Sequence, residues 1–168
     1  MMTAPKSVRA QFTIERTYAA TLEEAWALWT TKQGIESWWG PEGFDVSVLS
    51  MDLRAGGELI YRMTATGAEQ IAFMKQAGMP LATDCRITYT DVSAPQRLAY
   101  TTLADFVPGV EPYDVATIVE LKATSGGVKL LITFDAMHDD IWTERARAGH
   151  ESQLSKLDEL MDKRTPVR

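Results

Sequence analysis

The sequence is poor in the residues that most often carry chemistry: among 168 residues it has one cysteine, Cys85, and two histidines, His138 and His150. A single cysteine excludes an intrachain disulfide, which suits a reducing compartment, and we expect a cytoplasmic location. Positive charge is also scarce, because 17 lysines and arginines face 23 aspartates and glutamates and leave a net charge of −6. This balance disfavours binding to nucleic acid or to an anionic membrane surface.

Long apolar runs are absent as well. No stretch is long enough to span a bilayer, and residues 1–16 lack the apolar centre of a secretory signal. Apolar residues nevertheless make up 45% of the chain, which is enough for a substantial core. The length favours a single domain over residues 1–168, with its core at about residues 8–162 and loose tails at both ends.

Short alternating segments separated by turn residues predict about seven strands. Thr21 and Glu24 have the spacing of a capping box, so a helix is expected over residues 21–31, followed by a short helix over 33–39. A long helix is expected over residues 139–162. The strands are expected at residues 8–18, 44–53, 56–65, 85–92, 97–103, 113–123 and 128–134.

The connections between these strands are too short for parallel crossovers, so the sheet should be antiparallel and bury its apolar face against the long helix. This predicts an α+β fold in which a curved sheet wraps around the closing helix. One stripe of that helix faces the sheet and is apolar mainly in its second half. Its members are Ile141, Trp142, Arg145, Ala146, Gly149, Gln153, Leu154, Leu157, Leu160 and Met161.

A long connection at residues 67–83 interrupts the strand series, and residues 69–75 within it have the pattern of a short amphipathic helix. Long ordered connections are more often functional than accidental, so we expect Phe73 and Met74 to close a binding site as a lid. The alternative is a surface helix that packs these two side chains on the body of the domain.

Trp38 and Trp39 are adjacent and precede Gly40 and Pro41. Neighbouring residues cannot share one face of a regular element, and Gly-Pro stops a helix, so at least one indole should lie at a bend. A bend of this kind beside an apolar interior often forms the wall of a pocket. The alternative is that both rings plug the end of the core.

Several motifs in this order resemble a known family. They are Ala25-Trp26, Trp38-Trp39-Gly40-Pro41, Asp52 to Gly57, Asp91 to Leu98, and Gly149, Leu154 and Leu157. Together they resemble the START-like, SRPBCC superfamily, in the branch of activators of the heat-shock protein 90 ATPase. The resemblance implies the helix-grip fold, with two short helices after the first strand. Many members bind a hydrophobic small molecule between sheet and helix, whereas others are cyclases or chaperone activators. The closing helix of the family usually carries Gly-Trp, where this chain has Gly149-His150.

Signatures of catalysis and metal binding are few. Three consecutive residues rarely direct their side chains at one ion, so His138-Asp139-Asp140 is interpreted as a helix start with an aspartate cap. Cys85 is expected to be a buried, inert thiol. We predict no catalytic residue, no metal and no cofactor. His150 is either structural or a polar group in a pocket, where it would act as an anchor or as an acid or base.

The strand phase directs one set of side chains toward the helix, and three of them are tyrosines whose hydroxyls need partners. A ligand would supply a partner, although these hydroxyls can also bond one another or the backbone. The leading hypothesis is therefore a domain that binds a hydrophobic small molecule in a cavity between the sheet and the closing helix. Its predicted ligand-binding residues are Trp38, Trp39, Leu59, Tyr61, Met63, Phe73, Met74, Tyr89, Tyr100 and His150.

Two alternatives belong to other classes of protein. An enzyme of the cyclase or hydrolase kind would use His150 or a cavity tyrosine as an acid or base. A protein-interaction module would act on a chaperone, as the family branch implies. Exposed tryptophans or a free sheet edge would in addition support a homodimer.

Overall fold

The structure, a computed structural model, describes residues 10–105 and 107–162, and these form seven strands and four helices. The strands are β1 (Gln11–Tyr18), β2 (Phe44–Met51), β3 (Glu58–Ala65), β4 (Ala82–Ser93), β5 (Arg97–Ala104), β6 (Tyr113–Thr124) and β7 (Gly127–Asp135). The helices are α1 (Leu22–Thr30), α2 (Lys32–Trp38), α3 (Ala68–Gln76) and α4 (Asp140–Asp162).

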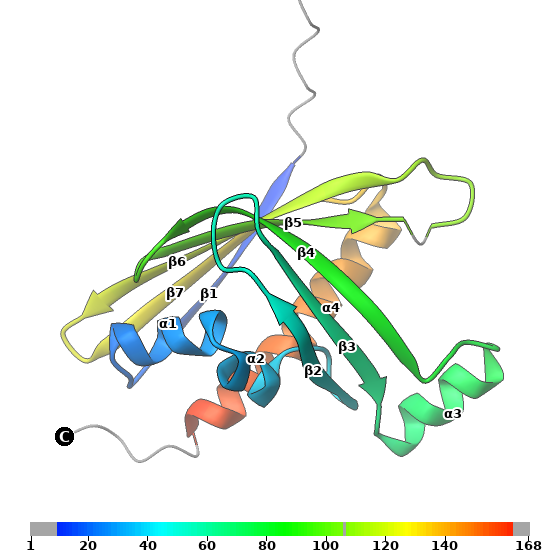
Figure 1. Ribbon diagram of the computed structural model, residues 1–168, viewed down its shortest axis with the longest axis horizontal. Helices are drawn as coiled ribbons and strands as arrows, with labels where there is room; N and C mark the ends of the chain where they lie inside the picture. Colours follow the sequence, from blue (N-terminus) through cyan, green and yellow to red (C-terminus); the bar gives the residue numbers. More distant parts are fainter. Residues whose placement is uncertain (1–9, 106, 163–168) are drawn as a thin grey trace, which may run out of the picture.

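All seven strands pair antiparallel in one sheet, in the order β1-β7-β6-β5-β4-β3-β2. β1 and β2 are therefore the two edge strands of the sheet. The chain crosses from one edge to the other through α1 and α2. The sheet curves, and the long helix α4 crosses one of its faces (Figure 1). This arrangement confirms the predicted α+β helix-grip architecture. None of the helices in the described ranges is both long and apolar enough to cross a membrane.

The two short helices meet at a tight corner. The predicted capping box begins α1: the Thr21 hydroxyl accepts from the Glu24 amide at 3.1 Å, and the Glu24 carboxylate accepts from the Thr21 amide at 3.2 Å. Thr31 then ends α1 and caps α2, because its hydroxyl accepts from the amide of Gly34 at 3.0 Å. Gly34 has no room for a side chain, since an added Cβ would overlap the carbonyl oxygen of Ala27.

Three indoles pack edge to face just beyond this corner. The ring centroids of Trp29 and Trp38 lie 4.6 Å apart, and that of Trp39 lies 5.4 Å and 5.2 Å from them. Trp38 is fully buried, and its indole N–H donates to the carbonyl oxygen of Leu28 at 2.8 Å. Gly40, with a φ of 87°, then turns the chain into the bend at residues 39–43. Both predicted indoles therefore contribute to the core.

The second half of α4 is fixed to the body of the domain. Leu154 and Leu157 are 1% exposed and pack into the core. The ammonium group of Lys156 donates to the carbonyl oxygens of Trp39 at 3.2 Å and Phe44 at 2.9 Å. These bonds tie the helix to the bend after α2 and to the start of β2.

Side chains of β1 hold the same half of α4 from the other edge of the sheet. The Tyr18 hydroxyl donates to Asp158 at 2.6 Å, and Arg16 pairs with Asp158 at 3.4 Å and with Glu151 at 2.7 Å. Burial, together with the neighbouring carboxylate, raises the pKa of Tyr18, so its hydroxyl stays protonated and keeps donating. α4 is thus anchored to both edges of the sheet.

Gly149 lies in the interior of α4, where an added Cβ would meet nothing within 4 Å. Alanine loses less backbone entropy than glycine in a helix, so Gly149→Ala should raise the free energy of unfolding by about 0.5–1 kcal/mol. Urea denaturation measures this change. Gly34→Ala is the matched control and should lower stability, because its Cβ would overlap the Ala27 carbonyl. A loss of stability in Gly149→Ala would contradict the open space beside this turn of α4.

Candidate functional site

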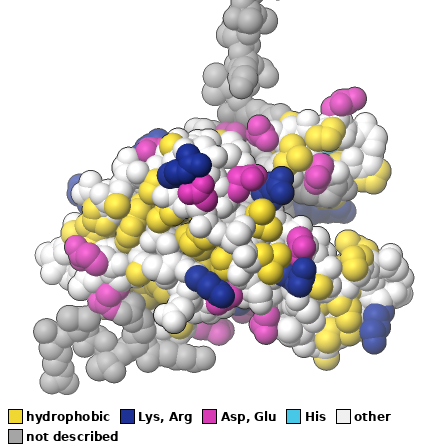
Figure 2. Space-filling model, viewed as in Figure 1, with side chains coloured by type: hydrophobic (Ala, Val, Ile, Leu, Met, Phe, Trp, Pro, Cys, Tyr) yellow, Lys and Arg dark blue, Asp and Glu magenta, His cyan; other side chains and the backbone are white. Residues whose placement is uncertain are grey.

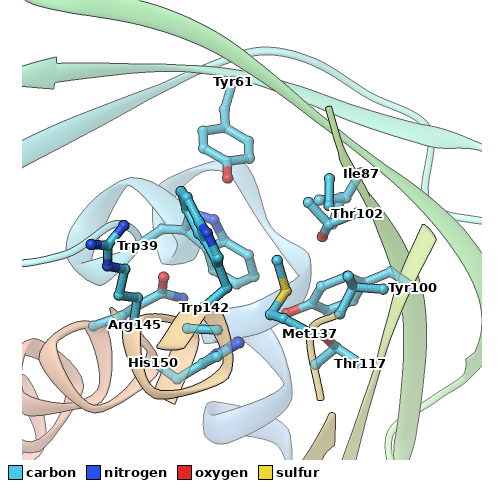
Figure 3. A pocket seen from close by; sticks show the side chains of 14 residues that line it. Trp39, Tyr61, Ile87, Tyr100, Thr102, Thr117, Met137, Trp142, Arg145 and His150 are labelled. Atoms are coloured by element: carbon cyan, nitrogen blue, oxygen red, sulfur yellow. The ribbon is translucent and has the colours of Figure 1, made fainter. Parts of the chain in front are cut away.

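A cavity of about 340 Å³ lies between the inner face of the sheet and the first half of α4. Side chains from β3 to β6 form one wall and side chains from α4 form the opposite wall (Figure 3). The lining residues are Trp39, Tyr61, Ile87, Tyr100, Thr102, Ala104, Val115, Thr117, Met137, Trp142, Arg145, Ala146, His150 and Gln153.

The cavity lies beneath the first half of α4, in which none of the side chains is fully buried. The buried side chains of α4, Leu154 and Leu157, both belong to its second half. In the first half, Ala146 and Gly149 are small, and Ile141 is 66% exposed. Close packing is therefore reached only where the helix is anchored, and space is left where small and polar residues face the sheet.

Two tyrosines, Tyr61 and Tyr100, extend from the sheet into the cavity (Figure 3). The Tyr61 hydroxyl lies near the side chains of Trp39 and Cys85, and the Tyr100 hydroxyl lies near that of Thr117. Burial raises the pKa of both phenols, so both are protonated at neutral pH. They form fixed polar points in a wall that is otherwise largely apolar.

The imidazole of His150 faces the cavity from α4 and packs on Phe134, with ring centroids 4.1 Å apart and planes 30° apart. Burial lowers the pKa of His150 to about 4, and the charge of Glu151 opposes this shift only in part. The imidazole is therefore neutral at neutral pH. It offers the cavity one donor and one acceptor nitrogen.

Trp142 lies about two turns before His150 on the same helix, and Arg145 lies between them. The guanidinium carbon of Arg145 lies 4.8 Å from the centroid of the Trp142 ring, a cation–π geometry. Arg145 is exposed, whereas His150 is largely shielded from solvent. The cavity thus has an open end beside Arg145 and a deeper region beside His150.

Comparison with known proteins assigns the family. The family of activator of Hsp90 ATPase homolog 1-like proteins matches residues 19–162. The chain belongs to this family. The match confirms the resemblance that the sequence motifs indicate.

Solved structures of AHSA1-like and similar proteins share the fold. A protein from Chromobacterium violaceum is 23% identical with a TM-score of 0.72, over 92% of this chain and 98% of that chain. The AHSA1 protein from Silicibacter pomeroyi is 22% identical with a TM-score of 0.69, over 92% and 100% of the two chains. At these identities the likeness establishes the architecture alone. A comparison with curated proteins gives no match.

The structure brings four of the predicted ligand-binding residues of this AHSA1-like chain to the cavity, namely Trp39, Tyr61, Tyr100 and His150. Trp38, Leu59 and Tyr89 have exposures of 0%, 0% and 1% and belong to the closed core, and Met63 packs partly buried against it. The strand phase correctly gives the inner face of the sheet, but it does not tell which part of that face lies under α1 and α2.

Tyr89 illustrates this difference. It pairs with Tyr100 across β4 and β5, yet it does not line the cavity. Its hydroxyl has no hydrogen-bond partner among the described residues, and burial raises its pKa to about 12. An unpaired buried hydroxyl costs about 1–3 kcal/mol. Tyr89 is therefore a core residue with an unsatisfied polar atom.

The predicted lid is not at the cavity. α3 stands at the far end of β3, where it projects from the body (Figure 1), and hydrophobic side chains are visible on the surface in this region (Figure 2). Phe73 is 65% exposed, whereas Met74 is buried. Gln70 packs so closely on Gly43 and Gly67 that a Cβ at either glycine would overlap it. This contact docks α3 beside β2. The surface alternative therefore holds for Met74, which packs on the body, but not for Phe73, which is exposed.

Sequence reasoning omitted several lining residues, above all Trp142, Arg145, Ala146 and Gln153. A signal for them was present, because they recur at helical spacing on the same face of α4 as His150. The stripe predicts a packing face, and its pattern alone does not connect the polar first half with a cavity.

His138 and Asp139 act at the start of α4, as predicted. The Asp139 carboxylate accepts from the Trp142 amide at 2.8 Å and lies 3.3 Å from the His138 ring. The other ring nitrogen of His138 bonds with the Tyr113 hydroxyl at 2.7 Å. Cys85 is partly buried, and burial raises the pKa of its thiol, so it is protonated at neutral pH.

The environment of His150 predicts a pH dependence of stability. The unfolded chain takes up the proton near the ordinary pKa of 6.5, whereas the folded protein takes it up near 4. Acid therefore favours the unfolded state across this interval, and His150 should lower the free energy of unfolding by about 2 kcal/mol between about pH 7 and about pH 5.

Urea denaturation at both pH values measures this difference. His150→Gln should remove most of the loss, and His138→Gln, which changes the other histidine, should leave it in place. If the free energy of unfolding fell equally between the two pH values in wild type and His150→Gln, His150 would not be shielded from water in the folded protein.

Proposed function

We propose that this protein binds a hydrophobic small molecule in the cavity between β3–β6 and α4. The observation that carries the proposal is the cavity itself, which has a volume of about 340 Å³ and walls of aromatic and aliphatic side chains with a few fixed polar groups. Sites for small organic ligands have this composition and volumes of about 300–1,000 Å³. The family supplies a fold in which such sites are expected.

The anchoring of α4 supports the proposal. A helix held only by apolar contacts would sink onto the sheet and fill the space. Here the bonds of Lys156 to Trp39 and Phe44, and those of Asp158 to β1, hold the second half of α4 at a set height. The first half extends from that anchor and spans the cavity, so the site is formed before a ligand arrives.

Acid–base catalysis is the second candidate, because His150 lies at the cavity rather than on the free surface. Its neutral imidazole would serve as a proton acceptor. The ring packs on Phe134, and none of the carboxylates in the described part of the chain bonds to it, so nothing orients it as in a catalytic dyad. Binding is accordingly the primary function that we propose.

Filling the cavity should abolish binding without unfolding the protein. Ala146 lines the cavity, whereas Ala148, two residues further along the same helix, is exposed to solvent. Ala146→Leu adds three carbons to the cavity and should weaken binding of the neutral dye N-phenyl-1-naphthylamine at least about tenfold. Ala148→Leu adds the same atoms to the free surface and should bind as wild type does.

Dye fluorescence and the shift of intrinsic tryptophan emission report the binding, since Trp39 and Trp142 both line the cavity. Native mass spectrometry of the purified wild-type protein would reveal a copurified ligand. Dye binding that is equal in both leucine variants, or absent from wild type, would refute a ligand site here. Absence would direct attention to the chaperone-interaction alternative.

A further inference from the structure

The cavity has a charge that nothing in the described chain neutralises. Arg145 is the one arginine or lysine among the lining residues, and none of the lining residues is an aspartate or glutamate. His150 adds no charge at neutral pH, since burial keeps its imidazole unprotonated. An apolar site thus carries one full positive charge at its open end.

Arg145 differs in this respect from the other arginines that the structure describes. Each of the others has a carboxylate oxygen within 4.0 Å, whereas the contact of Arg145 is the face of Trp142. The paired ones are Arg16, Arg54, Arg62, Arg86, Arg97 and Arg147. The pairing is widespread enough that an arginine without a carboxylate partner beside a cavity requires an explanation.

Two acidic residues near Arg145 in the sequence, Glu144 and Asp139, have other partners. Glu144 pairs with Arg147 at 3.7 Å. Asp139 accepts from the amide of Trp142 and lies against His138. Among the described residues the guanidinium is therefore left with all of its N–H donors available to a molecule in the cavity.

We propose that the ligand is a hydrophobic carboxylate, with its apolar body between the sheet and α4 and its carboxylate on Arg145. This inference rests on the binding function proposed above. A planar guanidinium matches a carboxylate with two parallel hydrogen bonds. At the open end the pair keeps contact with water, which avoids the large desolvation penalty of burying an ion. Trp142 holds the guanidinium plane in place beneath it.

Three probes with the same hydrocarbon chain test the charge. Decanoate, decanol and decylamine differ only at the head group, and each would be titrated against the dye bound to the full-length protein. Wild type should bind decanoate about tenfold more tightly than decanol, and decylamine most weakly. Arg145→Gln should bind decanoate and decanol with about equal affinity, and its affinity for decanol should stay within about twofold of wild type.

Arg147→Gln is the matched control, because it removes the same charge from the same helix at a residue that does not line the cavity. It should keep the tenfold preference, whereas Arg145→Lys should keep only part of it. Equal binding of decanoate and decanol to wild type, or equal loss of preference in both glutamine variants, would overturn the inference and leave the binding site standing. Failure of all three probes to displace the dye would overturn it as well, and failure of the dye itself to bind would refute the proposed function.

Discussion

The position of α4 depends on one half-buried cation. Lys156 donates to two main-chain carbonyl oxygens, those of Trp39 and Phe44, and so joins the last helix to a bend more than a hundred residues earlier. Burial lowers the pKa of Lys156, while the charges of Asp45 and Glu42 oppose that shift. Because carbonyl oxygens on the bend are rigid acceptors, the bonds set both the height and the direction of the helix.

The indole cluster makes this bend rigid enough to serve as an anchor. Trp38 fills the space under α1 and donates to the Leu28 carbonyl, which leaves its neighbour Trp39 to reach the cavity. One tryptophan therefore belongs to the support and the next to the site. Cavity and core share a wall here, so a change in the packing of the core would also change the shape of the site.

The sequence predicts the fold well, because the fold depends on patterns within short segments of the chain. Alternation gives the strands, the Thr21–Glu24 capping box gives α1, and the apolar second half of the closing helix gives its packing face. The site is predicted only in part. Trp39, Tyr61, Tyr100 and His150 reach the cavity, whereas Phe73 does not. Where α3 docks depends on the contact of Gln70 with Gly43 and Gly67, and periodicity within a segment carries no information about such a contact.

The sheet order has a consequence for how the chain is made. β1 is synthesised first, yet it pairs with β7, so its partner emerges from the ribosome more than a hundred residues later. Until then the apolar side chains of β1 have neither a neighbouring strand nor the helix that covers them. Pairing between strands that are so far apart in the sequence slows folding and prolongs the exposure of aggregation-prone segments. β1 therefore stays unpaired in the nascent chain until β7 has been made, and it joins the sheet after the other strands have been synthesised.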